Sequence, residues 1–307
     1  IEFHTKMNAL DDDIAGMLGA GVEEARANWR AIVITNDAPD FSVGANLAQV
    51  LMASRMRQFQ LIERAIVNLQ QANMALKFSP VPVVVAPAGR VLGGGCEIVM
   101  HGQHVRAAAE TYLGLVEVGV GLVPAGGGCK EMLARWQTLV RKVTHEGGPF
   151  APARHAFEII AVATVATSAD DARTYGFLTK TDAVTLDRER LLTDAKADAL
   201  ALAATRASGA WQPPEQAVIR PAGVGARLAL EQQVENLRLR GAVTAHDVVV
   251  AGKLAGVLTG GEHSPIETLT EQDILDLERE AFLSLCGTAA TQARMDHMLK
   301  TGKPLRN

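Results

Sequence analysis

The chain has 307 residues, of which 48% are apolar and 21% charged, a balance that indicates a soluble globular protein with a substantial core. Its 30 basic and 34 acidic side chains give a net charge of −4, so the overall charge provides no electrostatic basis for binding nucleic acid or an anionic membrane. The three cysteines are an odd number without zinc-site spacing, which argues against a disulfide framework and favours a reduced, cytoplasmic location.

The start of the chain carries no sign of export. The sequence contains neither a secretory leader pattern nor an apolar run long enough to cross a membrane. It opens without an initiator methionine, and residues 1–4 (IEFH) already have the composition of a strand. We therefore expect the chain to be a piece of a longer protein.

The first hundred residues alternate between apolar strands and helical segments. Strands are predicted at 31–35 (AIVIT) and 83–86 (VVVA), and residues 46–77 have the apolar spacing of one or two helices. The second strand leads through three glycines into a short helical segment at 96–102. This alternation predicts an α/β fold with mainly parallel strands.

The later part of the chain becomes increasingly helical. Extended chain is predicted at 112–117, and a helix that ends near Val143 follows the segment PAGGG. A Pro/Gly-rich linker is expected near 209–225. Helices are predicted after it at 225–240, 244–258 and 270–285, the last with Thr270 and Asp273 as a capping pair. We expect a catalytic core at 1–187 and a helical C-terminal region at 188–307.

The segment 93–97 (GGGCE) has the composition of a catalytic turn. A glycine run between a strand and a helix can aim backbone N–H groups at developing negative charge, for example on a thioester oxygen. Glu97 and a second glutamate, Glu117, could then perform acid/base chemistry. The alternative is that the glycines form a tight packing turn, Glu97 caps a helix and Glu117 is a solvated loop residue.

Other candidate sites have weaker support. The glycines at 126–128 resemble an anion-binding helix start, but they lack the lysine and hydroxyl of a P-loop, so a structural turn is favoured. His101 and His104 have no nearby carboxylate or third ligand and are interpreted as ordinary histidines, so no metal site is expected. A GxGxxG fingerprint after a strand is absent, so we expect this chain not to bind NAD.

Three motifs taken together resemble the crotonase family of enoyl-CoA hydratases and isomerases. They are residues 41–47 (FSVGANL), 93–97 (GGGCE) and 114–117 (GLVE), the last followed by GLVP. The resemblance covers roughly residues 1–187 and implies a crotonase (ClpP-like) β-β-α superhelix with an α-helical C-terminal region. The tail, including LDLEREAF at 275–282, resembles the C-terminal half of bacterial multifunctional fatty-acid oxidation enzymes. In those proteins an NAD-dependent 3-hydroxyacyl-CoA dehydrogenase precedes the hydratase part, so NAD would bind only in a missing upstream domain.

The resemblance also implies roles for individual residues. The backbone N–H groups of Ala45 and Gly94 would form the oxyanion hole, and Glu97 and Glu117 would be the catalytic acid/base pair. Further residues would bind the substrate or, as the alternative, serve as ordinary core: Val43, Gly44, Leu47, Leu51, Gly93 and Val118. No tightly bound cofactor is implied, because the CoA thioester is the substrate.

The function expected from this resemblance is hydration of a trans-2-enoyl-CoA in fatty-acid β-oxidation. Two carboxylates favour hydration over isomerisation, for which one base can suffice. An enoyl-CoA isomerase and a non-catalytic acyl-CoA-binding or assembly domain are the alternatives. The resemblance further implies a homo-oligomer, with a trimer common in the family.

Overall fold

The computed structural model of the protein describes residues 1–143 and 148–307. Two compact units are assembled from separated stretches of the chain, and each is described by itself below. The first unit comprises residues 1–45, 67–114 and 165–215, and the second comprises 46–66, 115–164 and 216–307. Each unit thus contains residues from early and late parts of the chain. The predicted division into 1–187 and 188–307 is sequential, and it stays a prediction about domain organisation.

Parallel strands form the centre of the first unit. Among the described residues, one sheet has the strand order β1-β2-β4-β6, and a separate pair joins β3 to β5. Ile34 lies opposite Val85 in the first sheet, and Gly89 lies opposite Thr111 in the pair. The strands are β1 (Ile32–Thr35), β2 (Val83–Ala86), β3 (Gly89–Leu92), β4 (His104–Ala108), β5 (Thr111–Gly114) and β6 (Ala183–Thr185). The predicted parallel α/β arrangement is confirmed.

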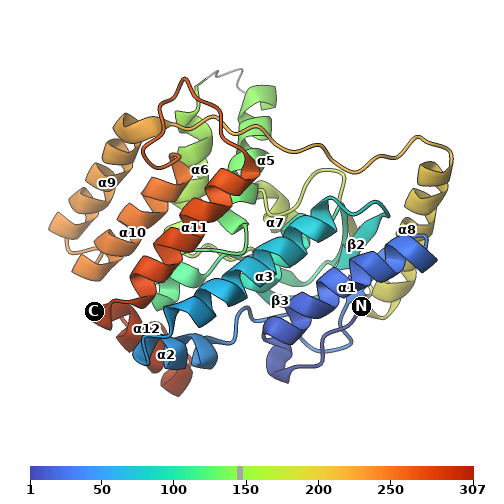
Figure 1. The fold of residues 1–307 in the computed structure, drawn as a ribbon, viewed down its shortest axis with the longest axis horizontal. Coiled ribbons are helices and arrows are strands. Elements are labelled where there is room, and N and C mark those ends of the chain that lie inside the picture. Colours follow the sequence, from blue (N-terminus) through green and yellow to red (C-terminus); the bar gives the residue numbers. More distant parts are fainter. Residues whose placement is uncertain (144–147) are drawn as a thin grey trace. The chain divides into compact units, whose positions relative to one another are not determined.

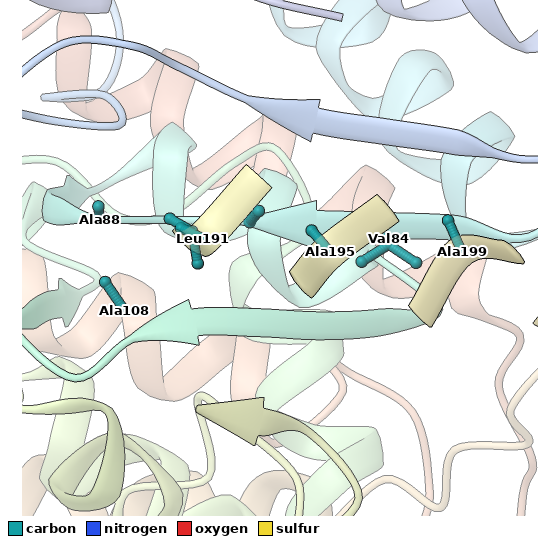
Figure 2. Close-up of a cluster of buried hydrophobic side chains, with 7 residues drawn as sticks. Val84, Ala88, Ala108, Leu191, Ala195 and Ala199 are labelled. Atoms are coloured by element: carbon teal, nitrogen blue, oxygen red, sulfur yellow. The ribbon is translucent and has the colours of Figure 1, made fainter. Parts of the chain in front are cut away.

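Strand β2 is buried along its whole length, which explains why it is a continuous run of valine and alanine instead of an alternating pattern. Helix α8 (Leu191–Ala207) covers it. Leu191, Ala195 and Ala199 recur every four residues on one face of α8 and pack into a cluster with Val84 (Figure 2). The small alanine side chains allow the helix to lie close to the strands.

The first unit contains further helices besides α8. They are α1 (Asp12–Asn28), α4 (Gly94–His101), α7 (Ala169–Thr174) and the second part of α3 (Phe59–Lys77). Asp11 accepts a hydrogen bond from the Ile14 N–H at the start of α1, and Ser168 accepts one from the Asp171 N–H at the start of α7.

The second unit is largely helical. Its C-terminal helices α9, α10 and α11 lie side by side, coloured orange to red in Figure 1, with α10 contacting both neighbours. Thr270 and Asp273 form the predicted capping box of α11, and Thr244 and Asp247 form another at α10. The helices are α2 (Leu47–Arg55), α5 (Gly128–Val143), α6 (Phe150–Ile160), α9 (Gly223–Leu239), α10 (Ala245–Leu258), α11 (Glu271–Cys286) and α12 (Ala289–Thr301).

Two predicted extended segments differ in the structure. Residues 1–4 are not a strand: Ile1 forms backbone hydrogen bonds with Val33 and Thr35 of β1, but the Phe3 N–H turns to the Asn36 side chain and ends the pairing. The extended chain predicted through 117 ends at Gly114, and Glu117 instead begins the 3₁₀ turn η2 (Glu117–Val120).

Strands β3, β4 and β6 were not predicted. Each has only three to five residues, too few for an alternation or an apolar run to mark it in the sequence. No helix within residues 1–143 and 148–307 combines the length and apolar character needed to cross a membrane.

Candidate active site

The glycine segment of the first unit forms a turn between β3 and α4. Gly93 has φ 54° and ψ −125°, a left-handed conformation that favours glycine, and its N–H donates to the Gly114 carbonyl at 2.9 Å. Helix α4 starts immediately afterwards at Gly94. The Gly94 N–H is therefore one of the N-terminal donors that have no partner within their own helix.

Gly44 approaches this turn closely. A Cβ atom on Gly44 would lie 2.9 Å from the Leu92 carbonyl oxygen and 3.5 Å from the Gly94 nitrogen, and its φ is +92°. The Gly44 carbonyl accepts a hydrogen bond from the Leu10 N–H at 2.8 Å. Because C=O and N–H point in opposite directions across a trans peptide, the Ala45 N–H is directed away from Leu10. Both predicted oxyanion donors thus belong to backbone segments that glycine brings together.

Glu97 is buried on α4, with 2% of its surface exposed. A Cβ on Gly94 would lie 3.7 Å from its Oε2, so the carboxylate folds back over the first turn of its own helix. An acidic group in this position interacts favourably with the N-terminal end of the helix dipole. The Glu97 carbonyl also contacts the His101 Nδ1 at 2.6 Å, which anchors the helix backbone around the carboxylate.

Glu117 lies in the second unit, at the first position of η2, and is half-buried. The turn closes at Gly121, which has a left-handed φ of 81°, and the Leu122 N–H donates to the Glu117 carbonyl at 3.0 Å. Glycine is required here because this backbone conformation is strained for other residues. The side chain of Glu117 is therefore presented by a short turn, not by a strand.

The predicted site residues are divided between the two units. The first unit holds Val43, Gly44, Ala45, Gly93, Gly94 and Glu97, and the second holds Leu47, Leu51, Glu117 and Val118. Leu51 is buried on α2, whereas Leu47 and Val118 are half-buried. Within the first unit, the structure brings Gly44, the Gly93–Gly94 turn and Glu97 together.

The glycines at 126–128 form an anion site that is occupied by a carboxylate of the same chain. The Glu278 carboxylate of α11 accepts hydrogen bonds from the Gly127 N–H at 2.8 Å and from the Lys130 N–H at 2.7 Å, at the start of α5. Sequence analysis favoured a purely structural turn. The turn does position α5, and it does so by binding a carboxylate at a helix N-terminus.

A buried ion cluster lies beside this turn. The Lys130 ammonium is fully buried and lies 2.5 Å from Glu131 Oε1 and 2.8 Å from Glu271 Oε2. Burial alone lowers the pKa of Lys130, but the two carboxylates outweigh it and hold the pKa above its usual value. Sequence analysis missed this cluster, because Lys130 and Glu271 lie in different helices, 141 residues apart.

The two histidines considered as metal ligands have other partners. His101 contacts the Glu97 carbonyl, and His104 Nε2 lies 3.2 Å from Asp198 Oδ2. Within the part of the chain that the structure describes, no group of three or more His, Cys, Asp or Glu side chains is arranged to hold a metal ion.

Solved structures with the same fold are crotonase-type enzymes. A carnitinyl-CoA dehydratase from Mycobacterium thermoresistibile superposes with a TM-score of 0.66 at 14% identity, covering 97% of this chain and 84% of that one. An enoyl-CoA hydratase from Rhodobacter sphaeroides 2.4.1 gives a TM-score of 0.62 at 18% identity, covering 98% and 86%. The chain therefore has the crotonase fold.

The sequence identifies the family within this fold class. The model of the enoyl-CoA hydratase/isomerase family matches residues 1–183, and the chain belongs to this family. A relative from Bacillus subtilis (strain 168), described as "Probable 3-hydroxyacyl-CoA dehydrogenase", is 41% identical over 307 residues. That match covers 100% of this chain and 38% of the relative, so the chain spans well under half of the relative's length.

Proposed function

We propose that this chain is an enoyl-CoA hydratase, which adds water across the double bond of a trans-2-enoyl-CoA thioester. The observation that carries the proposal is the close approach of Gly44 to the Gly93–Gly94 turn, with the buried Glu97 carboxylate folded over Gly94. This arrangement combines backbone donors and a carboxylate at one place, as acid/base chemistry next to a carbonyl requires.

The proposed oxyanion hole consists of the Ala45 and Gly94 N–H groups. Addition of water to a conjugated thioester places negative charge on the thioester oxygen as an enolate forms. Two features support these donors: the Leu10 hydrogen bond that directs the Ala45 N–H away from Leu10, and the position of Gly94 at a helix N-terminus. Loss of one such donor costs on the order of 10²–10³ in rate.

The proposed acid/base pair is Glu97 and Glu117. Glu97 accepts a proton from the attacking water, while Glu117 orients that water and delivers a proton to the α-carbon. The presence of two glutamates supports hydration over isomerisation, which one base can perform. Residues Val43, Gly44, Leu47, Leu51, Gly93 and Val118 are proposed to contact the acyl-CoA.

We also propose that the reaction belongs to fatty-acid β-oxidation. Hydration of a 2-enoyl-CoA yields a 3-hydroxyacyl-CoA, the compound named in the description of the Bacillus subtilis relative. We propose that the parent protein performs both steps, with NAD bound by a dehydrogenase part outside this sequence. We propose a cytoplasmic location, because an odd number of cysteines without zinc-site spacing favours a reducing compartment.

The test is hydration of crotonyl-CoA by the purified chain, followed as loss of the conjugated enoyl-thioester absorbance. Glu97→Gln and Glu117→Gln should each lower turnover by about 10²-fold or more, while Glu189→Gln, an exposed glutamate, provides the matched control and should retain it. A rise in the same absorbance with a 3-enoyl-CoA, and no hydration, would instead identify an isomerase. Binding of crotonyl-CoA without either reaction would identify a non-catalytic acyl-CoA-binding domain.

A further inference from the structure

The turn that carries Glu117 is connected to the C-terminal helices by two consecutive hydrogen bonds within the second unit. The Thr291 hydroxyl of α12 donates to the Gly121 carbonyl at 2.8 Å. His246 Nε2 of α10 lies 2.8 Å from the same hydroxyl oxygen. Thr291 is 0% exposed and His246 8% exposed, so water does not compete for these bonds.

The direction of the hydrogen bonds follows from the number of hydrogens available. A threonine hydroxyl has one hydrogen, and the Gly121 carbonyl can only accept, so the Thr291 hydrogen points to Gly121. His246 Nε2 must therefore carry a hydrogen and donate to Thr291. Burial, reinforced by the charge of Arg294, lowers the pKa of His246, so the ring is neutral at pH 7, with its hydrogen on Nε2.

A single peptide unit connects the Thr291 hydrogen bond to Glu117. The Gly121–Leu122 peptide accepts from Thr291 through its carbonyl and donates through its N–H to the Glu117 carbonyl at 3.0 Å. Because the peptide is planar and rigid, fixing its carbonyl also fixes its N–H. The backbone of Glu117 is thus held in place by a side chain 170 residues from Gly121.

The turn packs closely against three side chains. A Cβ on Gly121 would lie 3.0 Å from Thr291 Oγ1, 3.1 Å from Arg294 Cδ and 3.2 Å from His246 Nε2. Arg294 is itself 2% exposed and is held by Asp247 at 2.8 Å and by the Thr244 hydroxyl at 3.0 Å. The capping box of α10 therefore orders the arginine that supports the turn.

We propose that Thr291, oriented by His246, is a positioning residue that sets the location of the Glu117 carboxylate for proton transfer. The inference rests on the proposed function, since its effect on rate is exerted through Glu117. A misplacement of about 1 Å of a reacting group can cost on the order of 100-fold in rate. A defect in positioning lowers kcat, whereas loss of a contact made equally with substrate and transition state raises KM.

The test compares Thr291→Val, which keeps the shape and removes the hydroxyl, with Thr291→Ser, which keeps the hydroxyl. With crotonyl-CoA, we expect the valine variant to lose about 10–100-fold in kcat with KM within about twofold, and the serine variant to retain most activity. Thr301→Val, at the exposed far end of the same helix, is the matched control and should behave as the unmutated chain. His246→Gln, which keeps a donor near the Nε2 position, should also retain most activity.

A second arm separates positioning of Glu117 from a general structural effect. In a Glu117→Gln background, Thr291→Val should reduce the residual rate by less than about threefold, because both changes affect one group. An unchanged kcat in a folded Thr291→Val chain would overturn the inference. A loss in the Glu117→Gln background as large as the loss in the unmutated background would also overturn it. In either case the proposed hydratase activity would stand. An unmutated chain without hydratase turnover would overturn the proposed function and this inference together.

A third measurement covers the case in which Thr291→Val does not fold. His246→Leu leaves the Thr291 hydroxyl in place but removes the Nε2–H group that donates to it. We expect this variant to lower kcat severalfold and to speed hydrogen exchange of the Leu122 amide. An unchanged kcat and unchanged Leu122 exchange in this variant would contradict the proposed connection from Thr291 to Glu117.

Discussion

Lys130 of α5 and Glu271 of α11 form an ion pair across the second unit, with Nζ 2.8 Å from Oε2 and exposed side-chain fractions of 0% and 1%. Glu131 shares the same ammonium group at 2.5 Å. The pair joins α5 to a C-terminal helix that begins 141 residues after Lys130. Removing the cation would leave two carboxylates buried with less compensation than they have now.

We therefore expect Lys130→Met to lower the free energy of unfolding by about 3–5 kcal/mol, the range for breaking one side of a buried ion pair. Urea denaturation followed by circular dichroism measures the change. Lys196→Met, at an exposed lysine of α8, is the control and should change stability by no more than about 0.5 kcal/mol. Equal midpoints for the two variants would show that the buried pair contributes little.

Gly44 supplies a prediction about the proposed oxyanion hole. Gly44→Ala combines a positive φ with a contact of 2.9 Å to the Leu92 carbonyl, so the loop must move away from the Gly93–Gly94 turn. We expect kcat/KM for crotonyl-CoA to fall by about 10²-fold or more.

Gly209→Ala separates backbone strain from displacement of that loop. Gly209 also has a positive φ of +78°, but a Cβ there would meet nothing within 4 Å. This variant should lose about 1 kcal/mol of stability and keep full activity. If the two variants were equally active, the close approach of Gly44 to the turn would have no role in catalysis.

The buried thiols predict low chemical reactivity. Burial raises the pKa of Cys286 to about 12, and Cys96 and Cys129 are also buried. Because the thiolate is the reactive form, iodoacetamide at pH 8 should leave all three cysteines unmodified in the folded chain and alkylate them after denaturation. Mass spectrometry of intact protein measures this, and rapid alkylation under native conditions would contradict it.

Asp198 and Arg106 predict how stability changes in acid. Burial raises the pKa of Asp198, but hydrogen bonds from Arg106 and the charge of Arg106 outweigh it and hold the pKa below its usual value of 3.8. Since the folded-state pKa is the lower one, the stabilisation is complete above pH 3.8 and is lost as the pH falls through the folded-state value.

The difference in unfolding free energy between the unmutated chain and Asp198→Asn should therefore be constant near neutral pH and shrink below about pH 4. Denaturation at several pH values measures this difference. A difference that grew on acidification would contradict the lowered pKa. Asp187→Asn, which changes a different aspartate of the same unit, provides a reference for the general effect of removing a carboxylate.

Features specified by nearby residues could be predicted from the sequence. The cap at Thr270 involves Asp273, three residues away, and was identified correctly. The glycine turn before Glu97 was also placed correctly, although the helix begins at Gly94, inside the glycine run. Here the local sequence already contains the physical cause of the structure.

Features that depend on distant partners could not be predicted in this way. The alternating residues around Glu117 have the pattern of a strand, yet the segment turns, and the turn is supported by Thr291 far along the chain. Lys130 gives no local sign that its carboxylate partner Glu271 lies in another helix. Pairing such as Gly89 with Thr111 likewise requires knowledge of which short segments become neighbours.

The carboxylate of Glu278 also occupies a helix start that could otherwise bind a phosphate. A glycine-rich helix start attracts phosphate because its N–H groups have no partners. At α5, the Gly127 and Lys130 N–H groups already donate to a carboxylate that is 0% exposed. An incoming phosphate would have to compete with an anion that is covalently part of the protein and therefore present at very high local concentration. If the proposed acyl-CoA substrate binds, other groups must recognise its phosphates.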